Sequence, residues 1–196
     1  KLKKGSPGAD LITADGGFDF SVDFNKQEQM AHRLILAELL TGIKAQKLNG
    51  SLICKIFDSY SMITVQLLYL ISCLYEEVHL VKPLTSRPAN SEKYIVALSY
   101  KGFNTNQEEQ YYIYQLEKLL DKWDEINSNG LILKSIFENL SEEFFKRVDE
   151  YNKIGYQHQS TYIDKIINII NNNIKYKSLI FIIYNISILI IFILFY

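Results

Sequence analysis

The chain has 196 residues, of which 48% are hydrophobic and 22% are charged. This composition is that of an ordinary globular protein and excludes a disordered chain, and the length allows one full domain with a smaller appendage. Because 21 basic and 22 acidic residues give a net charge of -1, nucleic-acid binding would require a local basic patch.

Cysteine and histidine usage points away from disulfides and metals. Cys54 and Cys73 lie in apolar stretches without metal-ligand spacing, so we expect two small buried side chains in a reducing compartment. No apolar segment of a secretory signal follows the basic first residues, which favours a cytoplasmic protein. His32, His79 and His158 are irregularly spaced on different predicted elements, so no metal site is expected.

The first predicted element is a short strand over residues 10–15, which ends in Asp15 and is followed by Gly16 and Gly17. In a parallel sheet such a strand delivers its last residue to the edge where α/β sheets bind ligands. The glycines then allow a tight turn or a close approach to a ligand.

A helix is predicted next, over residues 26–46, with Asn25 as its cap. Its apolar residues at roughly helical spacing are Met30, Leu34, Ala37 and Ile43. Asn49 and Gly50 break this pattern. A second strand is predicted over residues 51–57, which are nearly continuous in apolar character, as expected of a parallel strand covered on both faces, with Lys55 as the exception.

The following helix is capped by Ser59 or Ser61 and runs to about residue 75. Its inward residues are predicted to be Val65, Leu68, Ile71 and either Cys73 or Leu74. A third strand over residues 77–81, a polar loop over 84–93 and a fourth strand over 94–100 complete the pattern. The order β-α-β-α-β-β predicts part of a wound α/β sheet, with antiparallel last strands because no helix connects them.

Beyond residue 102 the pattern becomes helical. Helices are predicted over residues 107–126, 131–140, 141–151 and 160–171, with Ser141 as a cap. Residues 179–196 carry no charge and follow Lys175 and Lys177, which predicts a C-terminal membrane anchor near the minimum spanning length. A buried helix and a low-complexity terminus are the alternatives. The predicted divisions are therefore 1–103, 104–178 and 179–196.

Charged residues stand at the ends of three predicted strands or in the adjoining loop: Asp15, Lys55 and Glu92. A lysine inside an apolar strand is costly to bury unless it is paired or functional. A salt bridge or a lysine whose ammonium reaches solvent is the structural alternative.

Three stretches now point to a family. They are D-L-I-T-A-D-G-G-F-D-F-S (residues 10–21), G-S-L-I-C-K-I-F (50–57) and K-P-L-T-S-R-P-A-N-S-E-K-Y (82–94). Together they resemble the FtsJ-like 2′-O-ribose RNA methyltransferases, above all the mRNA-capping forms of large DNA viruses, over about the first hundred residues. The resemblance implies a Rossmann-like methyltransferase sheet, S-adenosylmethionine as methyl donor and RNA, in particular capped mRNA, as acceptor. A viral protein would act in the host cytoplasm or the virion.

The resemblance also implies roles for individual residues. In that family an Asp, a Lys and a Glu at these motifs belong to a K-D-K-E tetrad, which corresponds to Asp15, Lys55 and Glu92. Lys55 would be the base or hold the developing alkoxide, while the two carboxylates hold its ammonium from either side. The implied cofactor contacts are Asp15, Gly16 and Gly17, and the implied RNA contacts are Ser86, Arg87, Lys82 and Lys93. For each RNA contact an ordinary solvated loop is the alternative.

One departure from the family pattern changes what we expect of the chain. The family's first tetrad lysine and its Gly-rich cofactor loop lie upstream of the D-G-G strand, whereas nine residues precede Asp10 and no G-x-G-x-x-G follows a strand here. We therefore expect the second half of the sheet, with residues 10–15 as an open edge and with the first half on a partner chain, lost, or lying outside this sequence. The alternative to an enzyme is a non-catalytic interaction module derived from a split or decayed methyltransferase, which binds through its helical tail.

Overall fold

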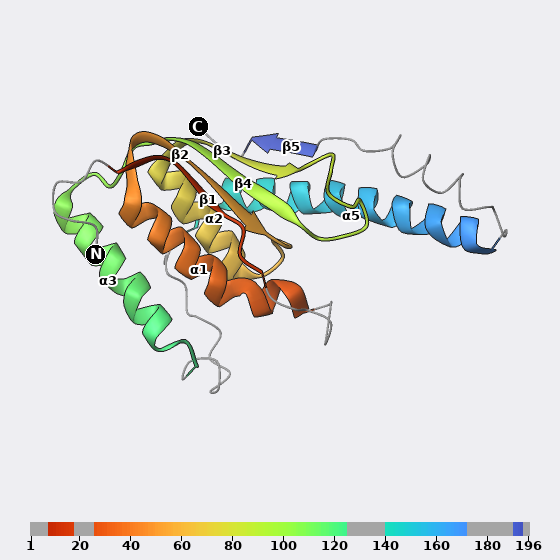
Figure 1. Cartoon of the computed structure of the whole chain (residues 1–196), viewed down its shortest axis with the longest axis horizontal. Helices are drawn as coiled ribbons and strands as arrows, with labels where there is room; N and C mark the ends of the chain where they lie inside the picture. Colours follow the sequence, from red (N-terminus) through yellow and green to blue (C-terminus); the bar gives the residue numbers. More distant parts are fainter. Residues whose placement is uncertain (1–7, 18–25, 125–139, 172–189, 194–196) are drawn as a thin grey trace.

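The computed structural model describes residues 8–17, 26–124, 140–171 and 190–193. They form a five-stranded sheet in the order β1-β2-β4-β3-β5 with helices packed beneath it (Figure 1). The strands are β1 (Ala9–Ala14), β2 (Gln46–Ile56), β3 (Tyr75–Lys82), β4 (Lys93–Tyr100) and β5 (Ile190–Ile193). The helices are α1 (Gln27–Ala45), α2 (Met62–Leu74), α3 (Asn106–Asp121) and α5 (Glu142–Asn171).

Strand directions agree with the predicted wound sheet. β1 and β2 are parallel, and β4 runs antiparallel to both β2 and β3, so β1, β2 and β3 all point the same way. β4 lies between β2 and β3 and starts from the edge where those strands end. The α/β fold class is confirmed: this is a mixed sheet consistent with the second half of a Rossmann-like methyltransferase, followed by a helical extension.

The main core lies between one face of the sheet and the helices α1 and α2. Buried side chains from alternate strand positions meet the inward faces of both helices; they include Leu52, Cys54, Ile56, Ile95, Ala97, Val78 and Leu80 from the strands and Ile35, Leu39, Val65, Leu68 and Ile71 from the helices. The intervening strand positions, such as Ile53 and Val96, which pair across β2 and β4, are only half-buried. The second face of the sheet is therefore less covered within the described residues.

The buried face predicted for α2 is confirmed, because Val65, Leu68, Ile71 and Leu74 are all buried. Burial differs from expectation at Met30 and at Cys73. In α1, Met30 is exposed and the buried face instead follows Ala31, Ile35, Leu36, Leu39, Leu40 and Ile43, because the sheet covers a face turned from the one predicted. Cys73 is exposed whereas Leu74 is buried, and Cys54 is buried as expected. Both thiols are free.

The predicted start of the second strand at residue 51 is wrong: α1 ends at Ala45, close to its predicted end, and β2 begins at Gln46 and runs through Asn49 and Gly50. Ala9 pairs with Gln46 while Leu11 pairs with Ser51, so residues 47–50 form a bulge in β2. Asn49 lies in the left-handed region with φ 63°. The Gln46 amide fills the bulge by donating a hydrogen bond to the Ala9 carbonyl at 2.8 Å.

Two of the predicted helix caps are confirmed. Ser61 caps α2 by accepting a hydrogen bond from the Thr64 amide at 3.3 Å, and the Ser141 hydroxyl accepts one from the Phe144 amide at 3.4 Å ahead of α5. Asn25 and the helix predicted over residues 131–140 lie outside the described residues. The two helices predicted over 141–151 and 160–171 are a single helix of 30 residues, α5.

The apolar tail takes part in the sheet at one point. Ile190–Ile193 forms β5, which pairs antiparallel with β3. The rest of the predicted anchor lies outside the described residues, and the predicted division into three segments stays a prediction. In the parts of the chain that the structure describes, no helix is both long and apolar enough to cross a bilayer.

Candidate active site

Asp15 and Lys55 meet at the edge where β1 and β2 end. Since Ala14 pairs with Cys54 in the parallel register, the next residues on both strands lie side by side. The Lys55 Nζ atom is 2.6 Å from Asp15 Oδ1 and donates a second hydrogen bond to the Asp15 carbonyl at 3.1 Å. The Lys55 side chain is 15% exposed and that of Asp15 is 71% exposed. The third N–H of the ammonium has no partner within the described part of the chain.

The glycine turn after Asp15 rests on α1. The Gly16 amide donates to Glu38 Oε1 at 2.8 Å, and a Cβ at Gly16 would lie 2.4 Å from that oxygen. Gly16 is thus needed for packing, whereas a Cβ at Gly17 would meet only Lys55 Nζ at 3.5 Å. Sequence reasoning did not assign Glu38 a role, although a carboxylate one helix away from a D-G-G turn is the kind of residue that could hold its amides.

Glu92 lies on the other side of Lys55 but does not contact it in the described structure. Its carboxylate accepts hydrogen bonds from the Tyr94 hydroxyl at 3.2 Å and from the Asn90 amide at 3.5 Å. Tyr94 pairs directly with Lys55 across β2 and β4. The structure thus shows no direct contact between Glu92 and the Lys55 ammonium, and Tyr94, the cross-strand neighbour of Lys55, binds Glu92 instead.

Tyr94 is the site residue that sequence reasoning missed. Burial, followed by the negative charges of Glu92 and Asp15, raises the pKa of Tyr94 to about 12. Its hydroxyl therefore stays protonated at neutral pH and donates to Glu92. The register of β4 against β2 could have indicated it, because a residue opposite Lys55 must point to the same face.

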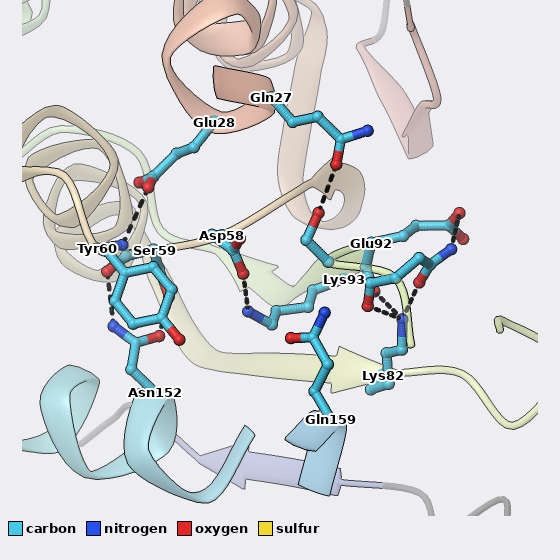
Figure 2. Close-up of polar contacts among 12 residues, drawn as sticks. Gln27, Glu28, Asp58, Ser59, Tyr60, Lys82, Glu92, Lys93, Asn152 and Gln159 are labelled. Atoms are coloured by element: carbon cyan, nitrogen blue, oxygen red, sulfur yellow. Dashed lines mark hydrogen bonds and ion pairs between the residues drawn. The ribbon is translucent and has the colours of Figure 1, made fainter. Parts of the chain in front are cut away.

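The side chain of Lys82, a predicted RNA contact, points into the loop that follows β3. Its ammonium donates to Ser86 Oγ at 3.2 Å, to the Asn90 carbonyl at 2.9 Å, to the Glu92 carbonyl at 2.8 Å and to Asn90 Oδ1 (Figure 2). Burial lowers the pKa of Lys82 to about 8, against the opposing effect of Glu92. We name residues 83–92 the substrate loop; Lys82 holds it closed from within.

Lys93, also a predicted RNA contact, is buried. Its Nζ is 2.8 Å from Asp58 Oδ1, with only 9% of the side chain exposed, and lies 5.8 Å from the centre of the Tyr151 ring. This position argues against a surface phosphate contact by Lys93.

Ser86 is half-buried, and its hydroxyl donates to Asn90 Oδ1 at 3.2 Å. Arg87 is exposed, and no partner for its guanidinium is found among the described residues. The four RNA-contact roles stay predictions, and Arg87 is the best placed of the four.

The three histidines occupy α1, β3 and α5. Burial lowers the pKa of His32, whose Nε2 lies 2.8 Å from Ser61 Oγ. Within residues 8–17, 26–124, 140–171 and 190–193, no group of three or more His, Cys, Asp or Glu side chains could hold a metal ion.

The site at the ends of the parallel strands β1 and β2 thus has four polar groups. They are the half-buried Lys55 ammonium, the exposed Asp15 carboxylate, the hydrogen-bonded Glu92 carboxylate and the protonated Tyr94 hydroxyl. A cation with an open donor direction can stabilise a developing oxyanion. An exposed carboxylate with two adjacent glycines can face a positively charged ligand at close range.

Comparison with known proteins identifies the family. The sequence profile described as FtsJ-like methyltransferase matches residues 1–100, half of the chain. The chain belongs to the FtsJ-like methyltransferase family. Members of this family generally use S-adenosylmethionine. The residues of the site described above all lie within the matched range.

Individual relatives of this FtsJ-like chain carry cap methyltransferase names. It is 32% identical over 161 residues to cap-specific mRNA (nucleoside-2′-O-)-methyltransferase 1A of Caenorhabditis briggsae, covering 81% of this chain and 18% of the relative. It is 44% identical over 94 residues to cap-specific mRNA (nucleoside-2′-O-)-methyltransferase 1 of Xenopus laevis, covering 48% and 11%. The predicted viral likeness stays a prediction.

A third relative qualifies these names. The chain is 31% identical over 163 residues to the inactive cap-specific mRNA (nucleoside-2′-O-)-methyltransferase 1B of Caenorhabditis briggsae, covering 81% of this chain and 19% of that protein. The chain spans less than a fifth of the length of these three curated relatives. Similarity alone therefore does not separate an active FtsJ-like chain from an inactive one.

Proposed function

We propose that this chain carries the catalytic edge of an S-adenosylmethionine-dependent methyltransferase that acts on the ribose 2′-hydroxyl of capped mRNA. The observation that carries the proposal is the Asp15–Lys55 pair, 2.6 Å apart at the ends of two parallel strands. Family membership and the names of the relatives support the reaction class.

Lys55 would act on the attacking hydroxyl. Its unpaired N–H direction can hold the developing alkoxide, and Asp15 fixes the ammonium through two contacts. Glu92 would act through Tyr94, whose hydroxyl donates to its carboxylate beside Lys55. Arg87, exposed on the substrate loop, would contact an RNA phosphate.

The residues present fit only the reacting end of the cofactor. The exposed Asp15 carboxylate and the open backbone at Gly17 suit the positively charged end of S-adenosylmethionine, whereas Gly16 is occupied by its packing on Glu38. The cofactor would supply an electrophilic methyl group. The adenosine end of the cofactor would be bound by the first half of an FtsJ-like sheet, on the same protein or on a partner chain.

The acceptor atom can be tested directly. The chain, alone and supplemented with the cofactor-binding half of an FtsJ-like relative, is incubated with tritiated S-adenosylmethionine and two short capped RNAs. One carries an ordinary first nucleotide and the other a 2′-deoxy first nucleotide. We expect label only in the first RNA. Equal labelling of both RNAs, or labelling of neither in both settings, contradicts the proposal.

A non-catalytic interaction module remains the second candidate, because one relative matched over 81% of this chain is named inactive. The less covered second face of the sheet and the edge position of β1 also favour this candidate. It predicts that the cofactor-binding half associates with the chain without restoring methyl transfer.

A further inference from the structure

Helix α5 is joined by polar contacts to the loop that follows β2. Asn152 Oδ1 accepts a hydrogen bond from the Ser59 hydroxyl at 2.6 Å, and Asn152 Nδ2 donates to the Ser59 carbonyl at 2.7 Å. Both residues are buried. Figure 2 shows Asn152 reaching up from α5 to this loop. A buried amide with both ends satisfied fixes the helix against the loop in one register.

The same helix holds the substrate loop. Two turns beyond Asn152, Gln159 Nε2 donates to the Ala89 carbonyl at 2.8 Å. Ala89 lies between Arg87 and Glu92, and the Gln159 side chain points toward this loop in Figure 2. A single helix therefore touches the loops at the ends of both β2 and β3.

Lys93 completes the link between these contacts. It follows Glu92 directly, forms its ion pair with Asp58 beside Ser59, and has the Tyr151 ring of α5 against its ammonium. Its burial is tolerated because a carboxylate and an aromatic face replace water. The first residue of β4 is thus anchored to α5 as well.

Within the described residues, other side chains hold the substrate loop elsewhere along its length, among them Tyr94, whose hydroxyl donates to the Glu92 carboxylate. Lys82 binds its carbonyl groups from within, and the Ser91 hydroxyl donates to Gln27 of α1 at 2.8 Å. Lys82 holds Asn90, whereas the carbonyl of the preceding residue, Ala89, is held by Gln159. Loosening that contact would release the part of the loop next to Arg87 while leaving the core of the sheet unchanged.

We propose that α5 is a positioning element of the RNA site, in which Gln159, supported by Tyr151 and Asn152, holds the substrate loop so that Arg87 and Glu92 face the RNA. This inference rests on the proposed function for the identity of the ligand. The helical extension is then part of the methyltransferase site, and Gln159 is a positioning residue because it acts through the loop.

The test compares two substitutions of the same kind on the same helix. Gln159→Glu removes the donor to Ala89 and keeps the side-chain size, whereas Gln157→Glu makes the same change at an exposed position. Both add one negative charge, so general repulsion of RNA is matched. Hydrogen exchange over residues 84–91 of the full chain, without any ligand, reports the loop directly. Fluorescence anisotropy with a labelled capped RNA reports its affinity.

We expect exchange over residues 84–91 to be about five-fold faster in Gln159→Glu than in Gln157→Glu, as loss of one neutral hydrogen bond implies. Exchange in β2 and β4 should be equal in the two variants. RNA affinity should fall by a similar factor in Gln159→Glu relative to Gln157→Glu. A merely structural residue would instead speed exchange throughout the sheet.

Equal loop exchange in the two variants would overturn the inference, whatever the chain binds. Faster loop exchange with equal RNA affinity would also overturn the positioning role. If the unsubstituted chain binds no capped RNA while the exchange contrast holds, the contact between α5 and the loop stands and the proposed function fails.

Discussion

Three lysines at one edge of the sheet show how differently one residue type can be used. Lys55 is paired with Asp15 and has one N–H without a partner in the described part of the chain. Lys82 is enclosed by oxygens of its own loop, and Lys93 is buried against Asp58 and Tyr151. The sequence places all three in family motifs but cannot tell them apart, because their direction depends on strand register and on α5. Only Lys55 is arranged to meet a reacting group.

Part of the candidate site could be predicted from individual residues of the sequence. Asp15 and Lys55 were expected together, because both follow from strands that end at the same edge, and the structure places them in contact. Glu92 was expected to touch the Lys55 ammonium, but its carboxylate accepts a hydrogen bond from Tyr94, the cross-strand neighbour of Lys55. Tyr94 ends the third motif, but only the register of β4 against β2 places it opposite Lys55, and Glu38 lies on α1, outside the three motifs.

Lys82 predicts a pH dependence of stability. Burial lowers the pKa of Lys82 to about 8 in the folded chain, below its ordinary value of 10.5. Between these values the unfolded chain holds more protons than the folded chain, so the contribution of Lys82 to the free energy of unfolding rises with pH. The free energy of unfolding, measured by urea denaturation, should therefore rise between pH 7.5 and 9.5 in the unsubstituted chain relative to Lys82→Met. A difference that is constant or falls over this range contradicts the lowered pKa.

At the scale of elements, the strands and helices of the first hundred residues follow from apolar pattern, while their irregularities do not. Residues 49 and 50 look like a break, yet β2 passes through them as a bulge that the Gln46 side chain fills. Gly155 lies in the gap between the helices expected over residues 141–151 and 160–171, yet α5 continues through it because packing on either side outweighs the helix propensity of one glycine. Tertiary contacts decided both cases.

Substitution by alanine should have opposite effects on the free energy of unfolding at Gly50 and at Gly155. A Cβ at Gly50 would lie 2.9 Å from the carbonyl oxygens of Ala9 and Asp10, so Gly50→Ala must push β1 away from β2. We expect it to lower the free energy of unfolding by about 1–3 kcal/mol. A Cβ at Gly155 would meet nothing within 4 Å, and Gly155→Ala should raise it by up to about 1 kcal/mol.

Urea denaturation of both variants measures these changes under one set of conditions. Equal stability of Gly50→Ala and the unsubstituted chain would show that β1 is not held in the register described.

At the scale of the whole molecule, the chain is an FtsJ-like α/β unit whose helical extension reaches back to its functional edge. The motifs predicted the sheet and its family because they encode local strand and turn chemistry. The contacts of α5 with Ser59 and Ala89 join residues 93 and 70 positions apart in the chain, and no local pattern reports them. The extension was therefore expected as a separate segment, whereas the structure packs it on the loops of the site.

The most direct test of the central claim compares two lysines of β2. Lys55 and Lys47 each pair with an aspartate at or just beyond β1, and the Lys47–Asp10 pair, at 2.7 Å, is exposed at the far end of the strand. Lys47→Ala therefore removes the same kind of ion pair as Lys55→Ala, but far from the site. Loss of this exposed pair lowers the free energy of unfolding by at most about 1 kcal/mol.

Single-turnover methyl transfer to capped RNA is measured for both variants, with the cofactor-binding half supplied. The account predicts a loss of about 10²–10³-fold in Lys55→Ala, the range seen when an oxyanion donor is removed, and a rate close to that of the unsubstituted chain in Lys47→Ala. Equal rates in the two variants would contradict a catalytic role for Lys55.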